Sequence, residues 1–160
     1  MSSLKGKTAL VTGSTSGIGL GIALELARQG ANLVLNGFGD PSAPQAEVRA
    51  AGAVHGIKVG YHGADMSKPE QIEAMMAYAA TEFGGVDILV NNAGIQHVAK
   101  VEDFPAARWD AIIAINLSSA FHTTRLAIPG MRQKNWGRVL NIASAHGLVA
   151  SAGKSAYVAS

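Results

Sequence analysis

A short apolar segment that leads into a glycine-rich turn and then a helical pattern constrains the fold of this chain more than any other feature. Residues 8–12 read Thr-Ala-Leu-Val-Thr, which is typical of a buried strand. The turn at residues 13–19 follows directly, and the helix is predicted to end near Gln29, before Gly30. Its apolar face is expected to contain Ile18, Ile22, Ala23, Leu26 and Ala27. A strand, a glycine turn and a helix in this order are typical of a doubly wound α/β fold.

The alternation of strands and helices continues along the chain. Further strands are predicted at 32–36, 58–62, 86–90 and 138–143, and helices at 41–52, 69–83 and 108–131. Because strands that alternate with helices form a parallel sheet, we expect one domain over residues 1–160, a Rossmann fold with strand order 3-2-1-4-5. In the helix at 108–131 the inward stripe is expected to comprise Trp109, Ile112, Ile113, Asn116, Leu117, Ala120 and Phe121.

Polar loops follow the first, fourth and fifth predicted strands, at residues 13–19, 91–94 and 144–146. In a parallel sheet the carboxyl ends of the strands lie at one edge, so the three loops are predicted to converge there on a single site. This expected convergence is stronger evidence for a binding site than any one of the motifs.

The glycine turn itself predicts a cradle for phosphate groups. Its spacing is G-x-x-x-G-x-G, and glycines at Gly13, Gly17 and Gly19 would let a pyrophosphate approach the backbone at a helix N-terminus. The alternative is a plain strand-to-helix turn. The dinucleotide interpretation is favoured because all three glycines lie between a buried strand and a helix.

The end of the second strand, where the adenosine ribose is usually bound, has no acid before Asp40 and no arginine before Arg49. The missing arginine and the neutral Thr15 favour NAD over NADP, and Phe38 could pack against the adenine. Asp65, after the third strand, could bond the adenine amino group or could anchor its own loop.

Four side chains with complementary chemistry lie within fourteen residues near the end of the chain: Ser144, His146, Lys154 and Tyr157. A phenol can exchange a proton with an alcohol or carbonyl oxygen while a second hydroxyl holds that oxygen, which is the chemistry of alcohol oxidation. The ordinary alternatives are a turn residue for His146 and a solvated charge for Lys154. Asn116 either bonds to the backbone or holds a water behind the site, because an unpaired buried amide would cost about 1–3 kcal/mol.

Composition excludes several other classes of protein. Charged residues make up 15% of the chain and hydrophobic residues 48%, which is typical of a globular domain. The net charge is +2 with no basic run, so no nucleic-acid partner is predicted. The chain has no cysteine, which suits a cytoplasmic protein, and no metal site is predicted. No membrane association is expected, because no apolar run approaches about 18 residues and the polar N-terminus does not resemble a signal sequence.

Taken together, these motifs resemble the short-chain dehydrogenase/reductase family over nearly the whole chain. The resemblance is carried by Thr12-Gly13-x-x-x-Gly17-Ile-Gly19, Asn91-Asn-Ala-Gly94, Asn116, Ser144 and Tyr157-x-x-Ser160. Segments 35–39, 91–97, 141–151 and 154–157 further resemble the bacterial members that oxidise (R)-3-hydroxybutyrate to acetoacetate with NAD. That resemblance implies a homotetramer and a small carboxylate substrate.

The resemblance also implies a role for each site residue. The implied catalytic residues are Asn116, Ser144 and Tyr157, with Tyr157 as general base. The implied substrate-binding residues are Gln96, Ser144, His146, Lys154 and Tyr157. The implied cofactor-binding residues are Gly13, Ser14, Thr15, Gly17, Ile18, Gly19, Phe38, Asp65, Met66, Asn92, Ala93, Gly94 and Tyr157.

The chain departs from the family pattern at its end. The family's catalytic lysine would fall at position 161, one residue after Ser160. We therefore expect the chain to be part of a longer enzyme, to end before the last strands of that enzyme, and to be inactive alone. Such a form would expose the edge of the fifth strand and the apolar face of its neighbouring helix. The alternatives are an NADPH-linked 3-oxoacyl reductase, a sugar dehydrogenase, or a dinucleotide-binding fragment without catalysis.

Overall fold

The computed structural model describes residues 4–160, and its centre is a parallel sheet of five strands in the order β3-β2-β1-β4-β5. The predicted order is therefore confirmed. In the register of the central strands, Leu10 pairs with Val34 on one side and with Leu89 on the other. The strands are β1 (Thr8–Val11), β2 (Asn32–Asn36), β3 (Val59–His62), β4 (Ile88–Asn91) and β5 (Arg138–Asn141).

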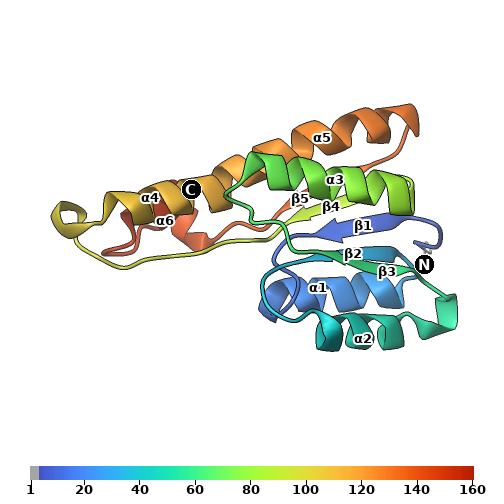
Figure 1. Ribbon diagram of the computed structural model, residues 1–160. Coiled ribbons are helices and arrows are strands. Elements are labelled where there is room, and N and C mark those ends of the chain that lie inside the picture. The colour runs from blue at the N-terminus through green and yellow to red at the C-terminus, as the bar shows by residue number, and fades with distance from the viewer. Residues whose placement is uncertain (1–3) are drawn as a thin grey trace.

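Helices cover both faces of the sheet: α1 and α2 lie on one face, and α3 and α5 on the other (Figure 1). This is the arrangement that right-handed crossovers between parallel strands produce. Within residues 4–160, no helix has both the length and the apolar character needed to cross a bilayer. The helices are α1 (Gly17–Arg28), α2 (Ser42–Ala51), α3 (Pro69–Phe83), α4 (Ala106–Ile112), α5 (Ser119–Gln133) and α6 (Ser155–Ala159).

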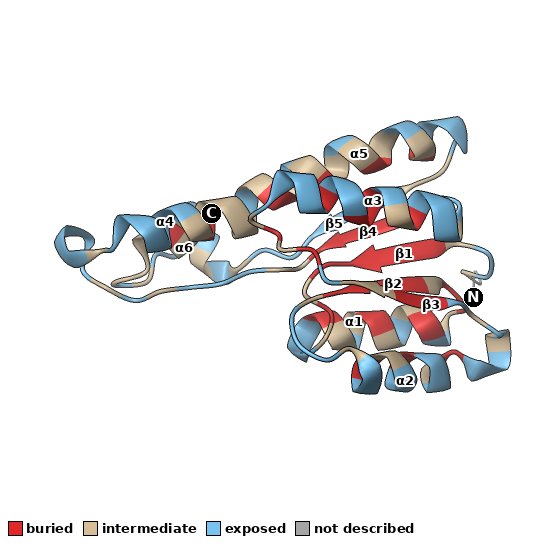
Figure 2. Cartoon of the chain, viewed as in Figure 1, coloured by how far each residue is buried: buried red, intermediate tan, exposed pale blue. Residues whose placement is uncertain are grey.

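The strands divide the buried side chains into two cores, because successive residues of a strand point to opposite faces. Leu10 and Leu89 pack with α3 and α5, whereas Ala9 and Val11 pack with α1 and α2. Figure 2 shows that β1, β2 and β4 are buried, while β5 is exposed along its length. The loops after β1 and β4 therefore begin at strands that are buried in the centre of the sheet.

The predicted helix at 108–131 is interrupted by a π-helical turn at Ile113–Ser118 that joins α4 to α5. The predicted inward stripe is wrong at three positions: Trp109, Leu117 and Phe121 are 38%, 50% and 62% exposed. A π-helical turn contains an extra residue, which rotates the helix face that follows it. Trp109 precedes this turn, on α4, and is exposed because α4 projects beyond the sheet (Figure 1). After the turn, the positions that face inward are Ser119, Thr123, Ala127 and Met131.

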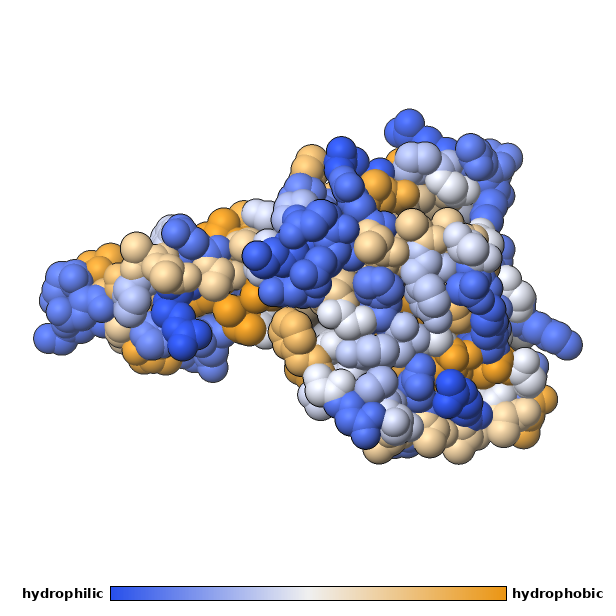
Figure 3. Space-filling model, viewed as in Figure 1, coloured by the Kyte–Doolittle hydropathy of each residue, from blue (hydrophilic) through white to orange (hydrophobic). Residues whose placement is uncertain are grey.

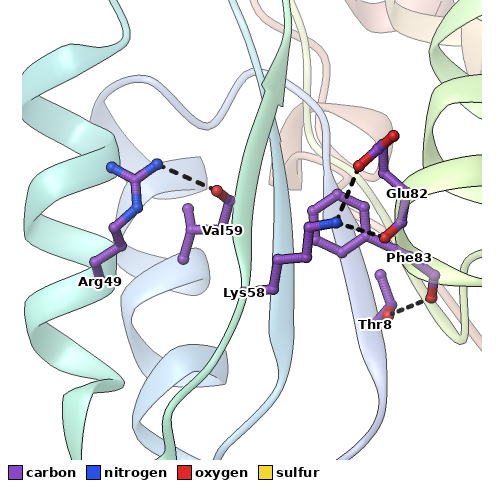
Figure 4. Close-up of polar contacts among 6 residues, drawn as sticks. All are labelled: Thr8, Arg49, Lys58, Val59, Glu82 and Phe83. Atoms are coloured by element: carbon purple, nitrogen blue, oxygen red, sulfur yellow. Dashed lines mark hydrogen bonds and ion pairs between the residues drawn. The ribbon is translucent and has the colours of Figure 1, made fainter.

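The two edges of the sheet differ in how they are covered. At β3, the Arg49 guanidinium donates to the Val59 carbonyl at 3.2 Å, and next to that strand the Lys58 ammonium bonds to the Glu82 carbonyl and carboxylate (Figure 4). At β5, Val139 and Leu140 are 38% and 46% exposed, so the exposure of this strand is as the sequence predicts. The neighbouring α5 is exposed only in part, because Phe121 is 62% exposed whereas Ala127 and Met131 are buried. Figure 3 shows further apolar side chains on the projecting part of the molecule that carries α4 and α6.

Asp87, which directly precedes β4, connects the start of β1 to the end of α5 at the edge of the sheet opposite the site. One carboxylate oxygen accepts from the Thr8 backbone N–H at 2.9 Å and the other from the Lys134 ammonium at 2.8 Å.

We expect Asp87→Ala to lower the free energy of unfolding by about 1–3 kcal/mol, because it leaves a buried N–H without an acceptor. Urea denaturation with an unchanged slope measures this. The control is Glu73→Ala, which removes an exposed ion pair with Arg125 and should cost at most about 0.5 kcal/mol. Equal losses in the two variants would contradict the role of Asp87.

Candidate active site

Thr12 and Asn92 join the loops that follow β1 and β4. The Thr12 hydroxyl oxygen accepts from the backbone N–H groups of Asn92 and Ala93, each at 3.0 Å. In return, the Asn92 side-chain amide donates to the carbonyls of Thr12 at 2.9 Å and Gly13 at 3.1 Å. These four bonds fix the two loops as one wall at the carboxyl edge of the sheet.

Asn36, the last residue of β2, connects the neighbouring loops and is 1% exposed. Its side-chain oxygen accepts from the Gly13 N–H at 3.2 Å, and its amide nitrogen donates to the carbonyls of His62 and Ala64 at 3.0 and 2.9 Å. From the sequence, this position was notable only because it is not an acidic residue. An amide at the end of a buried strand is the signal that could have revealed its structural role.

A cavity of about 420 Å³ lies along this wall, between the ends of β1, β2 and β4. The cofactor residues predicted from the sequence that line it are Gly13, Thr15, Ile18, Gly19, Phe38, Met66, Asn92, Ala93 and Gly94. The sequence analysis missed the remaining lining residues, Ser16, Asn36, Gly37, Ala64, Ile95 and Ile115. Ile18 is 70% exposed, so its predicted place on the buried face of the helix is wrong, because it faces the cavity instead.

Four residues of the predicted cofactor set do not line the first cavity, and one of them, Tyr157, lines the second cavity described below. Ser14 is buried, and its hydroxyl donates to the Val11 carbonyl at 2.7 Å. Gly17 begins α1 with a positive φ of 57°, a conformation that favours glycine. Asp65 anchors its loop by accepting from the N–H and the hydroxyl of Ser67, and these two bonds hold the pKa of the Asp65 carboxyl below its usual range. Any contact between these residues and a cofactor stays a prediction.

Glycines allow the chain to pack tightly where the first cavity meets the N-terminus of α1. A Cβ added at Gly19 would collide with the Gly13 carbonyl and the Asn92 amide, and one added at Gly37 would collide with the Thr15 side chain. The N-cap of α1, Ser16, forms no side-chain capping bond. The first N–H groups of this helix therefore face the cavity without a side-chain acceptor, which is the arrangement that binds phosphate oxygens at a helix N-terminus.

A second cavity, of about 860 Å³, continues from the first. Ile18 and residues 92–95 line both cavities, so the two form one groove. The structure brings together in this second cavity every predicted catalytic and substrate-binding residue, namely Gln96, Asn116, Ser144, His146, Lys154 and Tyr157. In the part of the chain that the structure describes, no group of three or more His, Cys, Asp or Glu residues could hold a metal ion.

Ser144 and Tyr157 reach this cavity from two short elements. The Ser144 hydroxyl oxygen accepts from the His146 N–H at 3.2 Å, which caps a 3-10 turn at Ala145–Gly147. The His146 ring meets the Tyr157 ring edge-on, with the ring centroids 6.3 Å apart. Tyr157 lies on α6, which the fully buried Ala156 anchors. A hydroxyl, an imidazole and a phenol thus face one space.

Asn116 lies within the π-helical turn and bonds to the loop that follows β4. Its side-chain oxygen accepts from the Ile95 N–H at 2.9 Å, and its amide nitrogen donates to the Ile95 carbonyl at 3.0 Å and to the Ser160 hydroxyl at 3.1 Å. The amide is therefore satisfied by the backbone, as one of the two alternatives from the sequence expected. Its position on the cavity wall is also compatible with the other alternative, in which it holds a water.

The chain matches the model of the short chain dehydrogenase family over residues 7–160 and belongs to that family. It is 74% identical over 156 residues to the D-beta-hydroxybutyrate dehydrogenase of Cupriavidus necator, a match that covers 98% of this chain and 60% of that protein. It is 61% identical over 153 residues to the enzyme of the same name from Rhizobium meliloti, covering 96% of this chain and 59% of that protein. The chain thus spans about three fifths of the length of these relatives.

A solved structure from Sinorhizobium meliloti, assigned to the short-chain alcohol dehydrogenases, superposes on this chain with a TM-score of 0.89 at 35% sequence identity. The superposition covers 99% of this chain and 62% of that one. Membership of the family implies a dinucleotide cofactor, and the glycine-lined cavity described above fits one.

Two glycines of α1 give a matched test of the dinucleotide site. Gly19→Ala should weaken binding of a nicotinamide dinucleotide at least about tenfold, or about 1.4 kcal/mol, because the added methyl group displaces the Gly13 carbonyl and the Asn92 amide. Gly21, two residues along the helix, has no atom within 4 Å of an added Cβ. Gly21→Ala should leave binding unchanged and raise the free energy of unfolding by about 0.5–1 kcal/mol. Calorimetric titration measures both affinities, and an equal effect of the two substitutions would contradict the assigned cradle.

Proposed function

We propose that the chain carries the cofactor site and the reacting side chains of an enzyme that reversibly oxidises (R)-3-hydroxybutyrate to acetoacetate with NAD. The observation that carries this proposal is the second cavity, where Ser144, Tyr157 and Lys154 face one space next to the dinucleotide cradle. The relative from Cupriavidus necator, whose name states this activity, supports it.

NAD would lie along the first cavity, with its pyrophosphate at the N-terminus of α1 and its adenosine near Phe38; when bound, it supplies a hydride acceptor. The loop after β2 presents Gly37 and Phe38 to this end of the cavity and no basic side chain. Thr15 beside them is also neutral, and its hydroxyl donates to the Phe38 carbonyl at 3.5 Å. A 2′-phosphate would find no cation among the residues that line this cavity, which supports NAD rather than NADP.

The far end of the second cavity would bind the substrate carboxylate. Gln96, His146 and Lys154 line it and offer an amide, an imidazole and an ammonium group as donors to a small anion. Since an ammonium–carboxylate bond is charge-assisted, Lys154 would supply most of the binding energy. The carboxylate would then hold the substrate hydroxyl near Ser144 and Tyr157.

The proton of the substrate hydroxyl would pass to Tyr157. Ser144 would hold the substrate oxygen by a hydrogen bond while the proton moves, and Asn116 would hold a water that relays the proton onward. A phenol keeps its proton at neutral pH unless positive charge lies nearby, so this step requires a cation beside the ring.

Substitution of Tyr157 tests the assignment of the general base. Tyr157→Phe should reduce turnover of 3-hydroxybutyrate at least about a thousandfold, within the range that general-base catalysis contributes, while NAD affinity stays within about twofold. The matched control is Tyr78→Phe, because the Tyr78 ring packs against Phe83 on α3, outside both cavities. The assay follows NADH absorbance with the chain and with the product of the complete coding sequence. Near-normal turnover in Tyr157→Phe would refute the assignment.

The competing activities are those of an NADPH-linked 3-oxoacyl reductase and of a sugar dehydrogenase. We expect kcat/KM with NAD to exceed that with NADP at least about tenfold, a difference of about 1.4 kcal/mol, because no cation lines the adenosine end. With NAD as the cofactor, kcat/KM for 3-hydroxybutyrate should exceed kcat/KM for uncharged alcohols and sugars of similar size. A preference for NADPH, or equal rates on substrates without a carboxylate, would favour the competitors.

A further inference from the structure

The side chain of Asn91, at the end of β4, bonds to two other elements beneath the second cavity. Asn91 is 8% exposed. Its oxygen accepts from the Thr123 hydroxyl of α5 at 2.7 Å, and its amide nitrogen donates to the Asn141 side-chain oxygen at the end of β5 at 2.9 Å. One amide thus connects β4, β5 and α5 at the edge of the sheet that carries the site.

The ordinary explanation for a threonine inside a helix is a bond from its hydroxyl to the preceding turn. Thr123 has that option, since its hydroxyl lies 3.0 Å from the Ser119 carbonyl and 3.2 Å from the Ala120 carbonyl. A hydroxyl has one proton, however, and the shortest of its contacts is the one to Asn91. The backbone hydrogen bonds of α5 do not require a threonine at position 123, whereas the buried side-chain oxygen of Asn91 needs a hydrogen-bond donor.

The polar row continues along α5 to the π-helical turn. The Ser119 hydroxyl, one helical turn before Thr123, donates to the Ile115 carbonyl within that turn at 2.6 Å. Ser119, Asn91 and Asn141 line the second cavity, while Thr123 lies below them and is fully buried. Part of the lining of the second cavity therefore belongs to a hydrogen-bonded polar layer.

Each end of this layer lies close in the chain to a residue of the proposed reaction. Asn141 precedes Ser144 by three positions, and the intervening Ile142 donates its N–H to the Asn91 carbonyl at 2.9 Å. On the other side, the π-helical turn that Ser119 supports carries Asn116. A shift of α5 against β4 would move Asn116 and Ser144 relative to each other.

We propose that Asn91 and Thr123 are positioning residues for the reaction: their hydrogen bond sets the distance of Asn116 and Ser144 from the wall at residues 92–95. This proposal rests on the proposed function. Neither residue exchanges a proton with the substrate, since the oxygen of Asn91 is occupied by Thr123 and the Thr123 side chain has no access to the cavity.

Thr123→Val tests the pair, because it keeps the shape of the side chain and removes the donor to Asn91. In the product of the complete coding sequence, we expect kcat for 3-hydroxybutyrate to fall at least about tenfold, with KM for NAD changed less than about threefold, because misplaced groups affect the chemical step more than cofactor binding. Thr123→Ser keeps the hydroxyl and should restore kcat to within about threefold of the original protein. Wild-type turnover in Thr123→Val would overturn the proposal.

A control separates positioning from simple loss of stability. Thr8 is also buried, and its hydroxyl donates to the Phe83 carbonyl at 3.3 Å at the opposite end of the sheet (Figure 4). Thr8→Val should lower the urea midpoint as Thr123→Val does, yet leave kcat per folded molecule within about twofold. Equal losses of kcat in the two variants would overturn the positioning role. If Thr123→Val does not fold, Thr123→Ala, which removes the same donor to Asn91, takes its place, and wild-type turnover there would overturn the proposal.

A double-mutant cycle with Ser144 closes the test. If Thr123 acts by placing Ser144, then Thr123→Val should cost less than about threefold in a Ser144→Ala background, whereas additive losses would overturn the proposal. The cycle also separates the two levels of inference. Full activity of Ser144→Ala would overturn both the proposed function and this inference. An impaired Ser144→Ala together with a fully active Thr123→Val would overturn the positioning role alone.

Discussion

The four hydrogen bonds that join Thr12 and Gly13 to Asn92 and Ala93 are the constraint on which the rest of the site depends. They lie where the strand order reverses between β1 and β4, the point at which a doubly wound sheet opens a crevice. The absence of a side chain at Gly19 follows from them, because the Asn92 amide and the Gly13 carbonyl occupy the space that a Cβ would need. The wall that they fix lines both cavities, so the same bonds shape both parts of the groove.

The sequence could predict the strand order and most of the groove, because those features follow from local patterns: apolar runs of strand length, helical periodicity and glycines between them. The convergence of three loops after β1, β4 and β5 follows from topology alone, and the shared lining at residues 92–95 confirms it. Individual roles were harder to predict. Ser14 and Asp65 lie in the predicted loops, but their side chains bond within the protein and not along the cavity.

The features that the sequence could not predict depend on partners far away in the chain. Asn36 bonds to residues 23 to 28 positions away, and Asn116 bonds to Ile95 at a separation of 21. The π-helical turn has no local signature, and by rotating α5 it exposes Leu117 and Phe121 while it buries Ser119 and Thr123. A pattern that weighs apolar residues would choose the opposite face, because here the Thr123 hydroxyl bonds to Asn91 of β4 and the Ser119 hydroxyl to the Ile115 carbonyl, and neither needs solvent.

The groove is built in separable parts. The first cavity is lined by the loops after β2 and β3, through Phe38 and Met66, and the second by Gln96, His146 and Lys154 from the segments after β4 and β5. Only Ile18 and residues 92–95 belong to both. Redesign of one specificity can therefore proceed without disturbing the other, provided that the shared wall is kept. In a scaffold of this kind, substitutions in the loops that line one cavity can change which ligand that cavity binds while the shared wall stays the same.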